Sequence, residues 1–243
     1  MKKAIGYVYV IAAAVCWGFL GLFNRVLTAA GVSLLNMMPL RFGGTAILFT
    51  VFCMMFKQQV FHIKLRHLPI FLGSGLISML LVLCGCALVS GIVGSDVGIS
   101  LEGLLMGLAS ELCYGGYTIF THYGMRYCDS FTMAYWTFLI AGIASLFLAD
   151  GPALLSALAE PRTGLAALGL MVMGTALPFT LYTKGLETVE SGKAAIIANI
   201  EPVMSAVIGV TVFQETLGLW TLVGIGLVLS GVVVLACEKE PDK

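Results

Sequence analysis

Residues 191–202 read Ser-Gly-Lys-Ala-Ala-Ile-Ile-Ala-Asn-Ile-Glu-Pro, which places a carboxylate and a proline inside an otherwise apolar stretch. A charged side chain near the centre of a bilayer costs roughly 2.5–3.5 kcal/mol, so a glutamate at such a position indicates a functional site. The proline removes one backbone hydrogen bond and frees the carbonyl of Ala198 where bulk water cannot reach it. Glu201 and Pro202 therefore predict a broken helix and a candidate site in mid-membrane.

The composition is that of an integral membrane protein. Hydrophobic residues make up 59% of the chain and charged residues 11%, and the mean hydropathy is +1.01, whereas about a quarter of the residues of a soluble domain are charged. A helix needs roughly 20 apolar residues to cross a hydrocarbon core about 30 Å thick. Runs of this kind predict an all-α membrane protein with about eight transmembrane helices, at residues 4–24, 36–56, 68–95, 103–121, 130–149, 163–183, 192–213 and 216–237.

The first apolar run is interpreted as a retained helix rather than a signal peptide. Met1-Lys2-Lys3 precedes it and Ala12-Ala13-Ala14 resembles a cleavage site, but the run continues to about residue 24, beyond the length of a signal sequence core. The seven cysteines lie inside or beside apolar runs and are expected to act as small apolar side chains. Neither a disulfide framework nor a metal or cofactor site is expected.

The basic residues predict the orientation in the membrane. With the amino terminus inside, eight crossings place the loops 57–67, 123–129 and 184–191 and both termini in the cytoplasm. Ten of the thirteen Lys and Arg then lie on that side, against Arg162 alone outside, which agrees with the positive-inside rule. We expect a multi-pass protein of the bacterial cytoplasmic membrane with both termini cytoplasmic.

Two parts of the chain are similar to each other. Val228-Leu-Ser-Gly-Val232 repeats the pattern of Leu88-Val-Ser-Gly-Ile92, which suggests one copy of a unit at residues 4–95, with three spans, and a second at 103–237, with five. Copies that begin on opposite faces are inverted in the membrane, the arrangement from which many secondary transporters are built. The first copy is 43 residues shorter, about the length of two helices and a turn.

A series of short motifs resembles the EamA-domain branch of the drug/metabolite transporter superfamily. They are Cys16-Trp17-Gly18, Arg41-Phe42, Tyr182-Thr-Lys-Gly185, Ala194-Ala195, Glu201-Pro202, Gln214-Glu-Thr-Leu217 and Gly224-Ile-Gly226 followed by Ser230-Gly231. The resemblance implies two inverted five-helix repeats that move a small metabolite, such as an amino acid or a drug, with gradient-driven efflux as the expected activity. Residues 4–95 then form an incomplete EamA-like repeat and residues 103–237 a complete one.

The departure from the family pattern lies in the first repeat. Residues from Gly73 resemble the start of the family's third helix and Leu83–Ile92 resembles its fifth, so the fourth helix is missing and the flanking halves are joined near residues 79–82. The joined run of about 28 residues would be about 42 Å long as one helix. It therefore requires tilt, a break near Gly85 or a protruding end.

Glu111 and Glu201 are expected to face the protein interior. Glu111 lies about 12 Å into its span and is flanked by Gly103, Gly107 and Gly115, a stripe that permits two helices to approach closely. Removal from water favours the protonated form of a carboxyl, so one or both glutamates are hypothesised to couple proton release to substrate movement. The structural alternatives are that Glu201 caps freed backbone groups or pairs with Lys193, and that Arg41 neutralises Glu111.

Arg41, Trp17 and Tyr182 complete the candidate site. Arg41 either snorkels to the outer surface or attracts an anionic group of the substrate through charge-assisted hydrogen bonds. Five aromatic residues could line a cavity with amphipathic rings. Of these we predict Trp17 and Tyr182 in preference to Tyr114, Tyr117 and Trp136. Pro178, in Gly174-Thr-Ala-Leu-Pro178, predicts a second broken helix, with a simple packing kink as the alternative.

An intramembrane enzyme is the main rival function, and the sequence argues against it, because it contains no HExxH, DDxxD-like or GxSG pattern. The expected partners are the lipid bilayer and a small-molecule substrate, with no nucleic acid. The missing helices leave three alternatives open: a working transporter, one that needs a second copy of the chain to complete its pathway, and a transport-deficient remnant. Glycine stripes on the fifth and last spans allow either internal packing or a homodimer.

Overall fold

The computed structural model describes residues 2–61, 63–89 and 101–237, and every regular element in these ranges is a helix. The expected spans correspond to eight helices or groups of helices. They are α1 (Lys2–Gly18) with α2 (Leu20–Ala29); α3 (Leu34–Met38), η1 (Pro39–Gly43) and α4 (Gly44–Phe56); α5 (Leu68–Val89); α6 (Leu101–Gly124); α7 (Ser130–Ser145) with η4 (Leu146–Leu148); α9 (Pro161–Met171), η5 (Val172–Ala176) and α10 (Leu177–Gly185); α11 (Ser191–Ala198) with α12 (Ile200–Phe213); and α13 (Leu219–Cys237).

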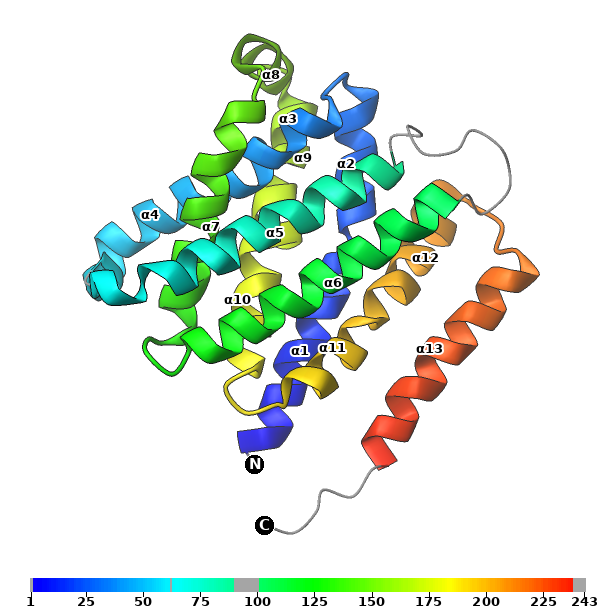
Figure 1. The fold of residues 1–243 in the computed structure, drawn as a ribbon. Helices are drawn as coiled ribbons and strands as arrows, with labels where there is room; N and C mark the ends of the chain where they lie inside the picture. Colours follow the sequence, from blue (N-terminus) through cyan, green and yellow to red (C-terminus); the bar gives the residue numbers. More distant parts are fainter. Residues whose placement is uncertain (1, 62, 90–100, 238–243) are drawn as a thin grey trace.

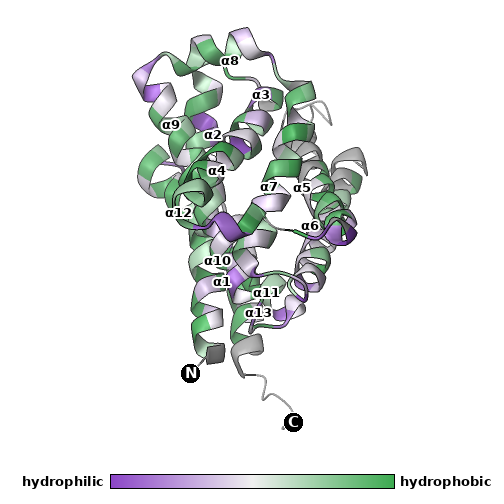
Figure 2. Ribbon diagram, turned by 90° about the vertical axis from the view of Figure 1, so that its left-hand side faces the viewer, coloured by the Kyte–Doolittle hydropathy of each residue, from purple (hydrophilic) through white to green (hydrophobic). Residues whose placement is uncertain are grey.

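The all-α membrane fold is confirmed. Four helical segments are long and apolar enough to cross a membrane, at Ala4–Ala29, Leu35–Phe56, Pro161–Gly185 and Ser191–Phe213, and shorter apolar stretches lie in α5, α7 and α13. Apolar residues predominate along the ribbon, and strongly hydrophilic residues gather mainly at turns (Figure 2). The assignment of residues 4–95 and 103–237 to two inverted repeats stays a prediction.

Two features differ from expectation, and a third decides among the alternatives left open for the long apolar run. The first span ends at Ala29 rather than at residue 24, and a short helix, α8 (Gly151–Leu158), precedes α9, with the Asp150 carboxylate accepting a hydrogen bond from the Ala153 amide at 3.3 Å. The break near Gly85 does not occur, because α5 is a single helix of 22 residues, or about 33 Å at helical rise. The expected end of that run, residues 90–95, lies outside the described residues.

The packing order explains which helices meet in the interior. α5 lies beside α6 and α7, and α1 packs against α10 and α12, as Figure 1 shows. The crossing of α1 and α10 requires glycine, because a Cβ on Gly185 would lie 2.5 Å from Val10 Cγ2 and 3.0 Å from the carbonyl oxygen of Gly6. The largest buried cluster joins side chains of α1, η1, α4, α6, α7, α10 and α11.

The last helix, α13, makes few contacts with the rest of the bundle. It touches α12 and α11 and stands apart at one edge in Figure 1. A Cβ added to Gly224, Gly226 or Gly231 would have open space around it. Among the described residues, nothing packs closely on these glycines of α13, and the same is true of Gly115 on α6, where a Cβ would meet nothing within 4 Å.

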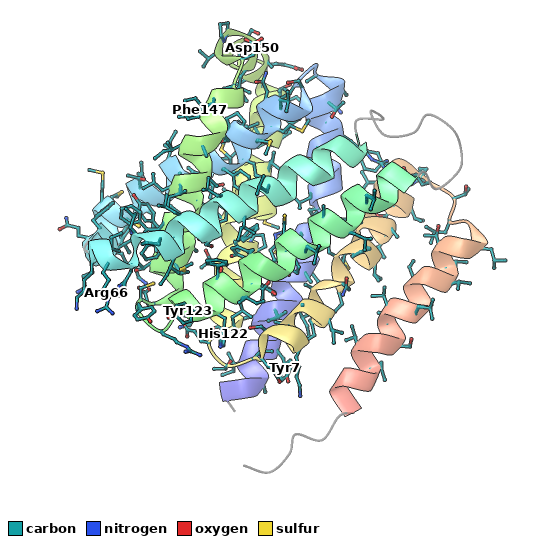
Figure 3. The ribbon with its side chains drawn as sticks, in the orientation of Figure 1. Tyr7, Arg66, His122, Tyr123, Phe147 and Asp150 are labelled. Atoms are coloured by element: carbon teal, nitrogen blue, oxygen red, sulfur yellow. The ribbon has the colours of Figure 1, made fainter. Side chains whose placement is uncertain are left out.

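The two ends of the bundle are distinct. The start of α1 and the end of α13 lie at the same end (Figure 1). Arg66, His122 and Tyr123 lie at that end too, whereas Phe147 and Asp150 lie at the opposite one (Figure 3). This arrangement has the parity expected of eight crossings, and which end faces the cytoplasm stays a prediction.

Candidate functional site

Four of the described spans are interrupted part-way along their length. The first span is broken at Phe19, between α1 and α2, and the span α11–α12 is broken at Asn199. Two π-helical turns, η1 at Pro39–Gly43 and η5 at Val172–Ala176, interrupt two other spans. Breaks and π-turns are common at functional sites because they re-aim side chains and leave backbone groups to be satisfied by other partners.

The break at Asn199 confirms the effect predicted for Pro202, and α12, which begins after it, packs against the break at Phe19 through Met204 and Ser205. The Ser205 hydroxyl on α12 donates a hydrogen bond to the Gly18 carbonyl at 3.1 Å. A side chain on Gly18 would collide with Met204, so the two broken helices touch nearly backbone to backbone. The Asn199 side-chain amide donates to the Ala195 carbonyl at 3.2 Å, which satisfies one group released by the break.

The two π-turns are also in contact. Arg41 Nε donates a hydrogen bond to Thr175 Oγ1 at 3.1 Å, and Thr175 Oγ1 in turn donates to the Leu170 carbonyl at 2.9 Å. The Arg41 guanidinium carbon lies 6.0 Å from the centre of the Phe179 ring. Arg41 is half-buried and its side chain lies between η1, η5 and α10, while both interpretations of its charge, snorkelling and attraction of an anionic substrate group, stay predictions.

An aromatic cluster lies next to this charge. The ring of Trp17 lies 5.0 Å from Phe179, 5.3 Å from Tyr182 and 6.4 Å from Tyr114, measured between centroids. Trp17, Tyr182 and Phe179 are almost completely buried. The structure thus brings together Trp17 and Tyr182, which the sequence had singled out, while Trp136 lies elsewhere and donates its indole hydrogen to the Val60 carbonyl at 3.0 Å.

Three buried polar atoms in and beside this cluster, Trp17 Nε1, Tyr114 Oη and Thr183 Oγ1, make no well-formed hydrogen bond with the described residues, although the Tyr182 hydroxyl lies beside that of Tyr114 and the Tyr117 hydroxyl beside that of Thr183. Nearly all buried polar groups in proteins are paired, and each that is not costs roughly 1–3 kcal/mol. The neighbouring hydroxyl of Tyr182 lies at 3.3 Å from Thr118 Oγ1. Hydrogen-bonding capacity on α1, α6 and α10 is therefore left over in and beside the aromatic cluster.

Glu201 lies at the edge of the same region. It is half-buried in the first turn of α12 and interacts electrostatically with Tyr114. The amino-terminal end of a helix stabilises a carboxylate, while removal from water favours the protonated acid, so the position balances two opposing influences. Glu111 is on α6, one turn before Tyr114, and its side chain lies outside the described residues.

Three residues of the candidate site were not predicted from the sequence. Phe179 links Arg41 to Trp17, Thr175 holds Arg41, and Thr183 supplies one of the unpaired hydroxyls. Thr175 lies in the motif that contains Pro178, and Thr183 lies in the motif that contains Tyr182. Their place in these two motifs is the only sequence feature that could have indicated them as site residues. Threonine is common in membrane helices, which is why neither stood out alone.

The four described cysteines, Cys16, Cys53, Cys113 and Cys128, are free thiols, and within the described residues no group of three or more His, Cys, Asp or Glu gathers as metal ligands would. Cys128 lies in the turn between α6 and α7. Burial, together with the negative charge of Asp129, raises the pKa of its thiol to about 11.

We expect Cys128, as the sole remaining cysteine, to react with maleimide roughly 300-fold more slowly at pH 7 than a thiol of ordinary pKa near 8.5, since only the thiolate reacts. The rate should rise about tenfold per pH unit up to pH 10. Gln58→Cys, at an exposed position of the same end, is the control in the same background. Equal rates for the two thiols at pH 7 would contradict the raised pKa.

Comparison with known proteins gives consistent results. The sequence profile of the EamA-like transporter family matches residues 101–237, from α6 to α13. The chain is 41% identical over 68 residues to an uncharacterized transporter of Archaeoglobus fulgidus, over 28% of the chain and 25% of that protein. It is 26% identical over 174 residues to the uncharacterized transporter YwfM of Bacillus subtilis, over 70% of the chain and 57% of that protein.

A third relative is the multidrug resistance protein EbrB of Bacillus atrophaeus, which is 32% identical over 87 residues, or 35% of the chain and 74% of that protein. The matched parts thus span between a quarter and just over half of the two transporters first named.

Proposed function

Because the chain belongs to the EamA-like transporter family of the drug/metabolite transporter superfamily, we propose that it carries a small polar metabolite or drug across the cytoplasmic membrane by secondary active transport. The expected direction is efflux, driven by a gradient. The name of the relative EbrB, a multidrug resistance protein, supports export of a drug-like or metabolite substrate.

The observation that carries this proposal is the set of unpaired polar atoms on Trp17, Tyr114 and Thr183. A bound substrate with hydrogen-bonding groups would satisfy them, and the flat rings of Trp17 and Tyr182 would form apolar walls around it. Arg41 supplies a positive charge beside Phe179, so a substrate with a carboxylate or another anionic group fits the site best.

Glu201 is the proposed coupling residue. In the protonated state it is neutral and tolerates the apolar interior, and its deprotonation places a negative charge at the helix break beside Tyr114. A substrate that carries a cationic group as well as a carboxylate, as an amino acid does, would bind the deprotonated carboxylate of Glu201. Uptake of a proton by Glu201 from outside would displace the substrate there, and loss of that proton to the inside would free the site for the next substrate, which is how a proton gradient drives export. Broken helices at the midplane supply the irregular backbone that such sites use.

The test is growth of cells that express the chain on a panel of inhibitory amino acids, nucleosides and drugs. We expect protection by the native chain and its loss in Glu201→Gln, because a glutamine cannot release a proton. Glu190→Gln is the matched control, since Glu190 is exposed at the start of α11, and it should protect like the native chain. Protection by Glu201→Gln with an unchanged pH dependence would contradict the coupling role.

A second candidate is a chain that completes its pathway only with a second copy. It is favoured by the sparse contacts of α13 and by the open space at Gly224, Gly226 and Gly231, which leave a helix face for another subunit. A variant with a family-like helix pair inserted after Met79 separates the alternatives. If only that variant protects cells, the native chain is a transport-deficient remnant. If the native chain protects cells and is dimeric, the result supports a pathway completed by a second copy of the chain.

A further inference from the structure

A cavity of about 1100 Å³ lies at the end of the bundle that holds the start of α1. It is bounded by the end of α4, by η2 (Gln58–Phe61) and η3 (Leu65–His67), and by the turn between α6 and α7. We call it the basic pocket, because Lys57, Lys64, His67 and Arg126 line it. It is separate from the cluster around Trp17.

The charges around the basic pocket favour an anion. Lys57, Lys64 and Arg126 face one carboxylate, that of Asp129, which accepts a hydrogen bond from the Thr132 hydroxyl. Arg66 is exposed at the same end (Figure 3) and acts electrostatically on Tyr127, as Arg126 does. The pocket therefore carries an excess of positive charge, and Lys and Arg together are a set that binds phosphate groups.

Neighbouring aromatic rings hold these cations in place. The Lys57 ammonium lies 4.8 Å from the centre of the Phe131 ring, and the Arg126 guanidinium carbon lies 5.3 Å from that of Tyr123. The rings of His67 and Tyr127 lie 4.4 Å apart. The hydrogen bond from Trp136 to the Val60 carbonyl anchors η2 to α7. The pocket is thus a structured site rather than a group of loose surface lysines.

One wall of the pocket is apolar and faces outward. Met55 and Phe56 line the cavity, yet their exposed fractions are 69% and 68%. Met54 on the same turn of α4 is 62% exposed. On a membrane helix, exposed apolar side chains are in contact with acyl chains, so the cavity opens on one side toward hydrocarbon and on the other toward charge.

We propose that the basic pocket binds the phosphate headgroup of an anionic phospholipid such as phosphatidylglycerol, with an acyl chain along Met54, Met55 and Phe56. A basic pocket next to membrane helices attracts anionic headgroups, and the apolar wall distinguishes a lipid from a soluble phosphate ester with the same headgroup chemistry. This site is independent of the transport function proposed above.

The test uses the full chain purified in a neutral detergent, with its thermal unfolding followed during titration. Three probes are added in turn: dioleoyl phosphatidylglycerol, dioleoyl phosphatidylcholine and glycerol 1-phosphate. We expect phosphatidylglycerol alone to raise the Tm in a saturable way. In the double variant Lys64→Gln and Arg126→Gln, half-saturation should require on the order of tenfold more phosphatidylglycerol.

The matched control is the double variant Arg162→Gln and Lys184→Gln, which removes the same charge at exposed positions away from the pocket and should titrate like the native chain. The single variant Lys64→Gln repeats the test in a chain that keeps the contact between Arg126 and Tyr123. An equal loss in both double variants, or no saturable shift in the native chain, would overturn the proposal. A shift with glycerol 1-phosphate as large as with the lipid would overturn the lipid assignment.

Discussion

Tyr114→Phe is expected to leave the folded protein at least as stable as the native chain while reducing substrate transport about tenfold. The reason for the first effect is that the Tyr114 hydroxyl is buried and makes no well-formed hydrogen bond with the described residues, its neighbour being the Tyr182 hydroxyl, and an unsatisfied buried group of this kind destabilises the fold by roughly 1–3 kcal/mol. The reason for the second is that a lost hydrogen bond to a substrate weakens binding by about 1 kcal/mol or more. Thr183→Val, which has nearly the same shape, should behave in the same way.

The contrast is with a hydroxyl that is paired. Thr118 Oγ1 donates to the Tyr114 carbonyl at 3.0 Å and lies 3.3 Å from the Tyr182 hydroxyl. Thr118→Val should therefore lower the Tm, by the equivalent of about 1 kcal/mol. Thermal unfolding and uptake into inverted vesicles, measured on all three variants, check the prediction. A Tm of Tyr114→Phe that falls as far as that of Thr118→Val would show that the Tyr114 hydroxyl is satisfied in the native protein.

Gly142→Leu should largely abolish the folded bundle. A Cβ on Gly142 would lie 3.0 Å from Gly43 Cα, 3.2 Å from Gly43 N and 3.2 Å from the Phe42 carbonyl oxygen. These are backbone atoms of the π-turn η1, so they cannot turn aside as a flexible side chain would. Overpacking a well-packed interior costs about 1–3 kcal/mol, and a leucine that forces α7 away from η1 should exceed that range.

The measurement is the yield of monodisperse protein in gel filtration, together with the Tm. Gly226→Leu is the matched control, because Gly226 is exposed on α13 and a Cβ there meets nothing within 4 Å. It should give native yield and a native Tm. Gly142→Ala should lie between the two. A normal yield for Gly142→Leu would mean that α7 and η1 tolerate separation.

The helices themselves could be predicted from the sequence because apolar runs of about 20 residues have few other solutions in a membrane. Pro178 and Pro202 also predicted where two spans are interrupted. The break at Phe19 and the π-turn at Pro39–Gly43 could not be predicted in the same way. No proline lies near Phe19 in the sequence, and the contacts at this break are made by Ser205 and Met204 of a distant helix.

The candidate site was predicted in part. Trp17 and Tyr182, which the sequence singled out together, lie in one cluster, and that they line a substrate cavity stays a prediction. The position of Arg41 was open in the sequence, since a long side chain near a helix end reaches either lipid or protein. Its contact with Thr175 is decided by the pairing of two π-turns, which is a long-range property. Whether the Thr183 hydroxyl finds a hydrogen-bond partner depends on how neighbouring helices pack, so no local sequence pattern predicts it.

The break at Phe19 lies against Met204 and Ser205 of α12, beyond the break at Asn199, and the π-turns η1 and η5 touch each other close by, with Gly174 of η5 packed against Leu20. At this level the continuous ladder of backbone hydrogen bonds that stiffens a helix is interrupted in four spans. A helix whose hydrogen-bond ladder is interrupted at one point bends at that point and stays straight on either side of it. We therefore expect the bundle to bend most readily around the aromatic cluster, so that a small rocking of one end against the other would change the cluster's shape while leaving both ends nearly rigid.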